Sequence, residues 1–299
     1  MSDVSELQED LNRLYDWTME SNMKLNDEKF ELLRYGPNEE FKLTTSYLTP
    51  SGSFIPEKIN LRDLGVIMSN DCRFDNHISK VIESSKSMMA WILRSFSTRK
   101  QEHMLLLWKT YVLPKLEYCS VLWCPLKAGL IKKIDSLQWS FLRKIKMDKS
   151  SNNYWQILKT LNLYSTQRRR ERYRIIYVWK IIENIVPNVN DSIHWYQHVR
   201  HGRKCKVDMV RGQSTTIQRH KDASFSIHGP KLFNALPKII RNITGESVDF
   251  FKKKLDLFLQ TIPDEPQIVG YTASRRADTN SIIDMIKFST MGLAHTANP

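Results

Sequence analysis

The sequence has few cysteines and no long apolar run. Four cysteines, Cys72, Cys119, Cys124 and Cys205, are spread over 299 residues without the spacing of a disulfide framework. No apolar run approaches the roughly 20 residues that a membrane helix needs. The first residues also lack the basic start and apolar core of a signal peptide. We therefore expect an intracellular protein, in the nucleus or cytoplasm, with reduced thiols and no membrane contact.

Sequence signatures of catalysis are equally scarce. Polymerases and nucleases hold two divalent cations about 3.5–4 Å apart with clustered carboxylates, whereas this chain contains no Asp-Asp dipeptide. A Walker A loop, a Gly-x-Ser-x-Gly elbow and a His-Glu-x-x-His helix are absent too. The residues therefore nominate no catalytic group, and they predict no cofactor for this chain.

One group of metal-ligand residue types remains: His194, His198, His201 and Cys205. On a continuous helix these residues would share one face, where three imidazoles and a thiolate can bind zinc. Gly202 and the surrounding lysines and arginines argue against a long helix and disfavour a dication. Zinc binding and ordinary surface histidines both stay open.

Positive charge is abundant but unevenly distributed. Residues 1–75 hold 8 Lys/Arg and 15 Asp/Glu, whereas the remaining 224 hold 37 and 17, so the net charge changes from −7 to +20. This asymmetry favours a polyanionic partner for the later part, with nucleic acid as the leading candidate. A basic surface that is merely solvated is the alternative.

Hydrophobic periodicity predicts an α+β protein that is mainly α. Residues 2–20 repeat apolar side chains at helical spacing. Alternating patterns then predict a small antiparallel sheet, with strand-like side chains at Phe41 and Leu43 and a further strand over 61–68. The expected parts are a helix on a small sheet over 1–74, a helical domain over 75–165, a helical C-terminal region over 166–260 and a poorly packed, flexible tail over 261–299.

Residues 94–126 are predicted to form the centre of the fold. Apolar side chains surround the helical wheel between Leu105 and Trp123, and a helix that is apolar all round is buried all round. Pro114 lacks an N–H and clashes with the preceding turn, so it should divide the segment into two helices. The cations in the segment suit a rigid support for something anionic: Arg94, Arg99, Lys100, Lys109 and Lys115.

Two further cationic clusters are candidates for nucleic-acid binding. The predicted helix over 129–146 carries Lys132, Trp139, Arg143 and Lys146 on one side. A tryptophan among cations can stack on a base; alternatively, Trp139 covers the edge of the core. The run Arg168, Arg169 and Arg170 opens an apolar helix and is expected to be a solvated helix start, with a nuclear signal as the alternative.

Several short strings follow one another along the chain, among them Asp63-Leu-Gly-Val66 and Tyr111-Val-Leu-Pro-Lys-Leu-Glu-Tyr118. Others occupy residues 7–17, 23–29, 74–78, 94–96, 120–126, 225–228, 232–237 and 250–256. In this order they resemble the reverse transcriptases of LINE-type (non-LTR, jockey-like) retrotransposons, over nearly all of residues 5–260.

The resemblance implies an RNA-directed DNA polymerase that uses two magnesium ions, and it assigns the parts of the chain. In that family an aromatic-Ala-Asp-Asp turn comes before the segment that matches residues 4–17, where Met1 stands here. Residues 1 to about 70 resemble the end of a palm, with Lys29 near the nucleotide phosphates and Asp63, Leu64 and Gly65 in a primer-grip-like hairpin. Residues 75–165 resemble the thumb that cradles the template–primer duplex.

Three hypotheses follow. The first is a fragment of such a polymerase that lacks the catalytic aspartates, is inactive alone, and binds an RNA–DNA hybrid or other nucleic acid through phosphates without base readout. The second is a host-recruited, non-catalytic interaction module whose basic faces are incidental. The third is a non-functional fragment that seldom folds, because a truncated palm leaves sheet edges and an apolar face uncovered.

Overall fold

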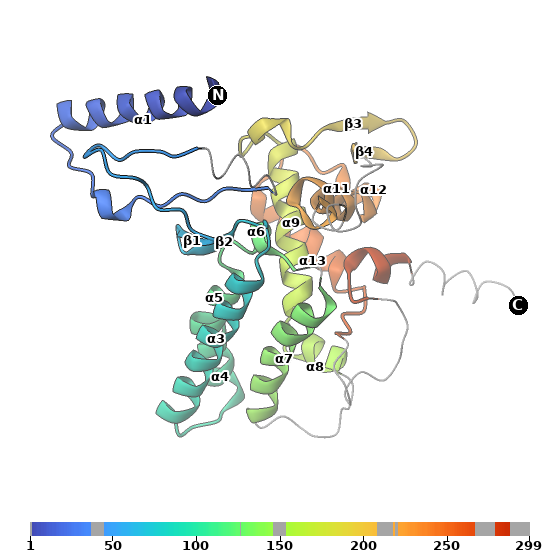
Figure 1. The fold of residues 1–299 in the computed structure, drawn as a ribbon. Helices are drawn as coiled ribbons and strands as arrows, with labels where there is room; N and C mark the ends of the chain where they lie inside the picture. The colour runs from blue at the N-terminus through green and yellow to red at the C-terminus, as the bar shows by residue number, and fades with distance from the viewer. Residues whose placement is uncertain are drawn as a thin grey trace, which may run out of the picture. The chain divides into compact units, whose positions relative to one another are not determined.

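The computed structural model describes residues 2–36, 45–125, 127–145, 154–207, 218, 221–266 and 279–287. The predicted strand positions Phe41 and Leu43 lie outside these residues. The chain forms two compact units, Met1–His77 and Ile78–Pro299, and each is described by itself (Figure 1). Helices predominate and two small antiparallel sheets accompany them, so the predicted α+β, mainly α class is confirmed. The boundaries expected after residues 165 and 260 fall inside the second unit.

The first unit joins a helix to a hairpin. It contains α1 (Ser2–Glu20), the 3-10 turn η1 (Asp27–Lys29), β1 (Asn60–Asp63) and β2 (Val66–Ser69). α1 packs through Tyr15, whose buried ring meets Phe30 edge-to-face at 5.7 Å. The Gln8 side chain accepts from the backbone N–H of Leu48 and donates to its carbonyl. Both contacts hold α1 on the segment that precedes the hairpin.

A two-residue turn separates β1 from β2. Asp63 pairs with Val66, so Leu64 and Gly65 form the tip, and the single strand predicted over 61–68 is wrong. The φ angles of Leu64 and Gly65 are +44° and +88°. Glycine adopts this left-handed region freely, but a leucine there brings its Cβ too close to the following carbonyl. The Leu64 side chain is 83% exposed, so packing does not compensate for this strain.

Leu64→Asn is expected to raise the free energy of unfolding of the first unit by about 1 kcal/mol. Asparagine tolerates the left-handed region and Asn-Gly is favoured in such turns, whereas the Cβ of leucine is strained there and its side chain is mostly exposed. Urea denaturation of the full chain measures the gain. Leu64→Ala is the control: alanine keeps the Cβ strain and should give no gain. An equal gain in both variants would show that exposure of the leucine, not its backbone, is the cause.

The described part of the second unit consists mainly of helices and includes the β3–β4 hairpin. Its elements in chain order are α3 (Asp75–Ser95, which starts in the first unit), α4 (Gln101–Leu107), the π-helical turn η2 (Trp108–Val112), α5 (Leu113–Glu117), α6 (Ser120–Trp123), α7 (Ala128–Lys144), α8 (Tyr154–Thr160), α9 (Thr166–Ile182), the 3-10 turn η3 (Val189–Asp191), β3 (Trp195–His198), β4 (Gly202–Cys205), α11 (Phe225–Ala235), α12 (Lys238–Arg241) and α13 (Val248–Leu259).

α9 is the central helix of the second unit (Figure 1). It packs against α6, α7, α11 and α13, and most of its side chains are buried. The prediction that residues 94–126 form the centre is therefore wrong. Trp108 and Trp123 are buried there, but Leu106 is 63% and Tyr111 45% exposed. One side of this segment faces solvent even though it is apolar.

Two helices meet near Pro114, as predicted, although the chain stays helical between them. α4 ends at Leu107, and Pro114 lies at the start of α5, directly after the π-helical turn η2. In that turn the N–H of Leu113 bonds to the carbonyl of Trp108, so the hydrogen-bond ladder shifts register just before proline, where an N–H is missing anyway. The helix ends near Cys119, whose φ of +51° is left-handed.

Part of the expected tail belongs to the core. Ile262, Ile282 and Met285 are buried in the apolar cluster around α9, so poor packing was a wrong expectation for these residues. The backbone N–H of Ile282 donates to the Glu171 carboxylate at 2.7 Å. A bond between residues so distant in sequence leaves no local pattern by which to predict it.

Candidate anion-binding groove

A groove of about 830 Å³ lies between α3 and α7. Ile82 and Met89 of α3 and Leu137 of α7 contribute buried apolar side chains to its lining. Residues three or four apart share a helix face, so the same faces present polar residues on either side of these side chains. Four exposed lysines also line the groove: Lys86, Lys132, Lys133 and Lys144.

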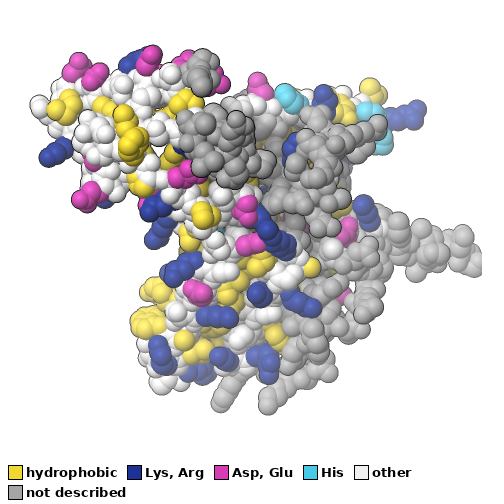
Figure 2. Space-filling view, in the orientation of Figure 1, with side chains coloured by type: hydrophobic (Ala, Val, Ile, Leu, Met, Phe, Trp, Pro, Cys, Tyr) yellow, Lys and Arg dark blue, Asp and Glu magenta, His cyan; other side chains and the backbone are white. Residues whose placement is uncertain are grey.

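The groove is positively charged. Glu83 is the one carboxylate among its lining residues, and it lies 3.7 Å from Lys80. No ion pair engages any of the four lysines within the part of the chain that the structure describes. Figure 2 shows Lys and Arg side chains gathered, with apolar side chains between them, over the surface where Figure 1 places α3 and α7. Such a surface attracts anions.

Lys132 is the predicted candidate that lines this groove. Arg94, Lys100, Lys109 and Arg143 are exposed outside its lining, and Lys146 lies outside the described residues. Three of the groove lysines were not predicted: Lys86, Lys133 and Lys144. The spacing of 11 residues between the last two, three helical turns, was a usable indication that they share a face.

Trp139 packs against protein. Its ring meets that of Tyr154, on α8, edge-to-face at 4.7 Å. The half-buried position supports the interpretation that Trp139 covers the edge of the core.

Two of the predicted cations, Arg99 and Lys115, donate hydrogen bonds to oxygen atoms in or just after α3. The Arg99 guanidinium donates to the carbonyls of Leu93 and Phe96 at the end of α3. The Lys115 ammonium donates to the Ser84 hydroxyl at 3.3 Å. Arg99 thus holds the segment after α3 against the end of that helix, and Lys115 holds α5 against α3.

The Arg168–Arg170 run is not a solvated helix start. Arg168 is 0% and Arg170 1% exposed, which places both out of reach of a phosphate at the surface. Arg168 donates to the Pro263 carbonyl at 2.6 Å and to the carbonyls of Leu259 and Ile262 at 3.5 Å. The Leu259 carbonyl ends α13, and those of Ile262 and Pro263 belong to the turn after it; a helix end needs such donors. The expectation failed because α13 lies some 90 residues further along the chain.

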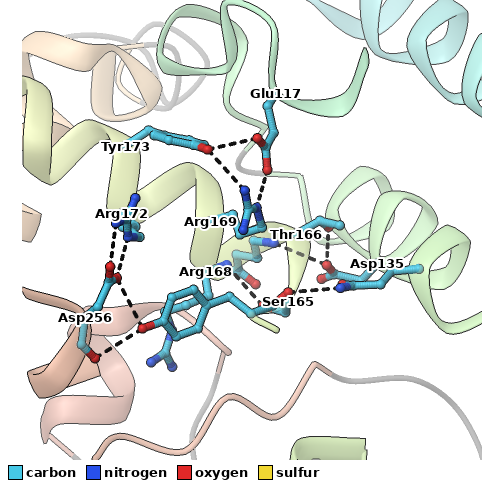
Figure 3. Close-up of polar contacts among 12 residues, drawn as sticks. Glu117, Asp135, Ser165, Thr166, Arg168, Arg169, Arg172, Tyr173 and Asp256 are labelled. Carbon is cyan, nitrogen blue, oxygen red and sulfur yellow. Dashed lines mark hydrogen bonds and ion pairs between the residues drawn. The ribbon is translucent and has the colours of Figure 1, made fainter. Parts of the chain in front are cut away.

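Polar contacts at the start of α9 join three other helices, α5, α7 and α13, to it (Figure 3). Arg169 pairs with Glu117 of α5, and Arg172 binds Asp256 of α13 through two bonds of 2.5 and 2.6 Å. Asp135 of α7 accepts from the Thr166 hydroxyl and the Gln167 N–H. Burial raises the pKa of Asp135 to about 6, opposed by the charge of Arg170 and by these two hydrogen bonds.

Asp135 should make stability depend on pH. Its folded pKa of about 6 exceeds its ordinary value, so its contribution is full below about pH 4 and is lost as the pH rises through 6. The folded and ordinary pKa values of Asp135 differ by about two, so ionisation of this carboxyl lowers the free energy of unfolding at pH 7 by about 2–3 kcal/mol. Asp135→Asn keeps an oxygen acceptor and should remove this loss. Urea midpoints at pH 4.5 and 7 give the comparison, with the exposed Asp249→Asn as control. Parallel pH curves for wild type and Asp135→Asn would contradict the assignment.

The candidates of the first unit are separate from this groove in sequence. Lys29 ends η1 with an exposed side chain, and Asp63, Leu64 and Gly65 lie at the end of the β1–β2 hairpin. Their assignment to nucleotide and primer contacts stays a prediction from the resemblance.

The histidines and Cys205 lie on or next to a hairpin and not on a helix. β3 pairs antiparallel with β4, so His198 faces Gly202, and the rings of His198 and His201 are 4.7 Å apart. Cys205 is buried, and burial raises the pKa of its thiol to about 12, which opposes the thiolate that zinc requires. Among the described residues no group of three or more His, Cys, Asp or Glu is placed to hold a metal.

Within the described ranges, no helix combines the length and apolar character needed to cross a bilayer. Comparison with protein-family models, with curated proteins and with solved structures finds no match to this chain.

Proposed function

We propose that the second unit binds a nucleic-acid backbone in the groove between α3 and α7. The observation that carries the proposal is the set of four exposed lysines around a single carboxylate that already has a lysine beside it. Phosphates supply most of the affinity in such complexes, and lysines contact them as point charges. The groove lining contains no aromatic residue, so it offers no platform for base stacking. Binding through the backbone without base readout is the mode that suits this lining.

The resemblance to non-LTR reverse transcriptases makes an RNA–DNA hybrid the proposed ligand. α3 and α7 both fall in residues 75–165, the part that resembles the thumb. We propose binding without catalysis for this chain, because its sequence has no Asp-Asp pair to hold the two magnesium ions of that family. Recruitment as a non-catalytic interaction module is the competing proposal, and salt dependence separates the two.

Substitution of Lys86, Lys132, Lys133 and Lys144 by glutamine is expected to flatten the salt dependence of hybrid binding. Each phosphate neutralised on a B-form-like duplex contributes about −0.9 to the slope of log K against log salt, so removing four such contacts should lower the magnitude of the slope by about 3.6. Fluorescence anisotropy with a blunt RNA–DNA hybrid at 50–300 mM KCl measures it.

The matched control changes the same number of charges elsewhere in the second unit: Lys238, Lys252, Lys253 and Lys254 to glutamine, on α12 and α13. The control slope should stay near the wild-type value. Equal flattening in both variants would show a diffuse charge effect and no groove. Weak, salt-insensitive binding by the wild type would instead favour the interaction module.

A further inference from the structure

A second surface of the same unit carries exposed aromatic rings. Trp91 of α3 is 46% and Tyr111 of η2 45% exposed. The Trp91 ring meets Tyr111 at 6.3 Å and Phe96 at 6.2 Å, edge-to-face in both pairs. In an edge-to-face pair the edge of one ring meets a face of the other, and both residues still keep nearly half of their surface exposed.

Within one helical turn of each ring, its own helical segment carries no carboxylate. One turn from Trp91 on α3 stand Ser87, Met88, Arg94 and Ser95, and one turn from Tyr111 stand Leu107, Trp108, Pro114 and Lys115. Two of these eight residues are cations and none is a carboxylate. Arg94 is exposed, three residues after Trp91, where side chains on a helix are neighbours.

This surface differs from the groove. On α3 the residues that line the groove share one helix face: Ser79, Ile82, Glu83, Lys86, Met89, Ala90 and Leu93. Trp91 is turned about 140° from the centre of that face, by 100° per residue. The groove offers charge without rings, and the second surface offers rings with an exposed arginine.

We propose that Trp91 and Tyr111 stack on unpaired bases of a nucleic acid while Arg94 contacts a phosphate beside them. Every base has a face that stacks on an aromatic ring, and such stacking needs no base-specific hydrogen bond. Charge complementarity with Arg94 favours a nucleic acid over an acid-poor apolar protein segment. This inference rests on the proposed function and extends it, because the ligand becomes a hybrid that carries a single-stranded extension.

The test uses the full chain and two probes, a blunt RNA–DNA hybrid and the same hybrid with a six-nucleotide single-stranded overhang. Wild type should bind the overhang probe at least about tenfold more tightly, since stacking contributes about 1–3 kcal/mol per base. Trp91→Leu with Tyr111→Leu should abolish this preference and leave the blunt affinity unchanged. Trp91→Phe with Tyr111→Phe keeps aromatic faces and should retain most of the preference.

Leu106→Ser is the control for an apolar surface without rings, because Leu106 is exposed in the neighbouring α4. It should not affect the preference. Equal affinity of wild type for the two probes, with the blunt hybrid bound, would overturn this inference alone. Failure to bind the blunt hybrid would overturn the proposed function. If Leu106→Ser reduces the preference for the overhang probe as strongly as Trp91→Leu with Tyr111→Leu does, the preference comes from apolar contact in general. That result would also overturn the stacking assignment.

Discussion

Trp179→Ala should lower the free energy of unfolding of the second unit by about 3–5 kcal/mol. Trp179 is 0% exposed and its ring stacks on Phe251 at 4.3 Å, with 6° between the planes. Its indole N–H donates to the Ile243 carbonyl at 2.9 Å. Alanine would leave a large cavity beside Phe251 in addition to the lost burial. It would also remove one of two donors to the Ile243 carbonyl, which keeps its hydrogen bond of 2.7 Å from Arg203.

The matched control is Tyr177→Ala, two residues earlier on the same helix. Tyr177 is exposed and its ring meets Phe225 at its edge, so its loss should destabilise far less. Urea denaturation of the full chain, followed by tyrosine and tryptophan fluorescence and by circular dichroism, measures both variants. A difference below about 1 kcal/mol would show that α9 is not the element on which this core depends.

The helical stripes were predictable, whereas the central helix was not. α3, α7 and α13 repeat apolar residues at three- and four-residue intervals, which any packed helix must do. α9 begins with cations that a sequence argument places in water. Arg168 is buried because it donates to carbonyls at the end of α13 and in the turn after it, and Arg169 pairs with Glu117 of α5. Those partners are far away in sequence, so local pattern could not reveal them.

The candidate groove illustrates the same limit. Lys132 was singled out because it shares a side with other cations on one helix. Lys86 could not be added by that reasoning, because it lies on α3, and nothing local shows that α3 and α7 face each other. A lysine on a helix is ordinarily solvated, so its type alone distinguishes no site. The structure supplies the pairing of helices, and the pairing creates the concentration of charge.

Arg168→Met is expected to destabilise the second unit by about 3 kcal/mol. The three carbonyls that accept from Arg168 end α13 and the turn after it, and methionine would leave them buried without that donor. Lysine should not rescue the loss, because one ammonium group cannot reproduce the fork of a guanidinium. Urea denaturation at pH 5 gives the comparison.

Arg170→Met is the control that separates lost hydrogen bonds from lost charge. Arg170 is as buried as Arg168, but its three guanidinium nitrogens have no hydrogen-bond partner among the described residues. A buried cation without such bonds contributes little, and replacing it with an apolar side chain of similar size is often neutral or stabilising. At pH 5 Asp135 is mostly protonated, so the loss of its cationic neighbour should matter little. Equal destabilisation by the two substitutions would mean that buried charge holds α9 in place, and not the bonds to α13.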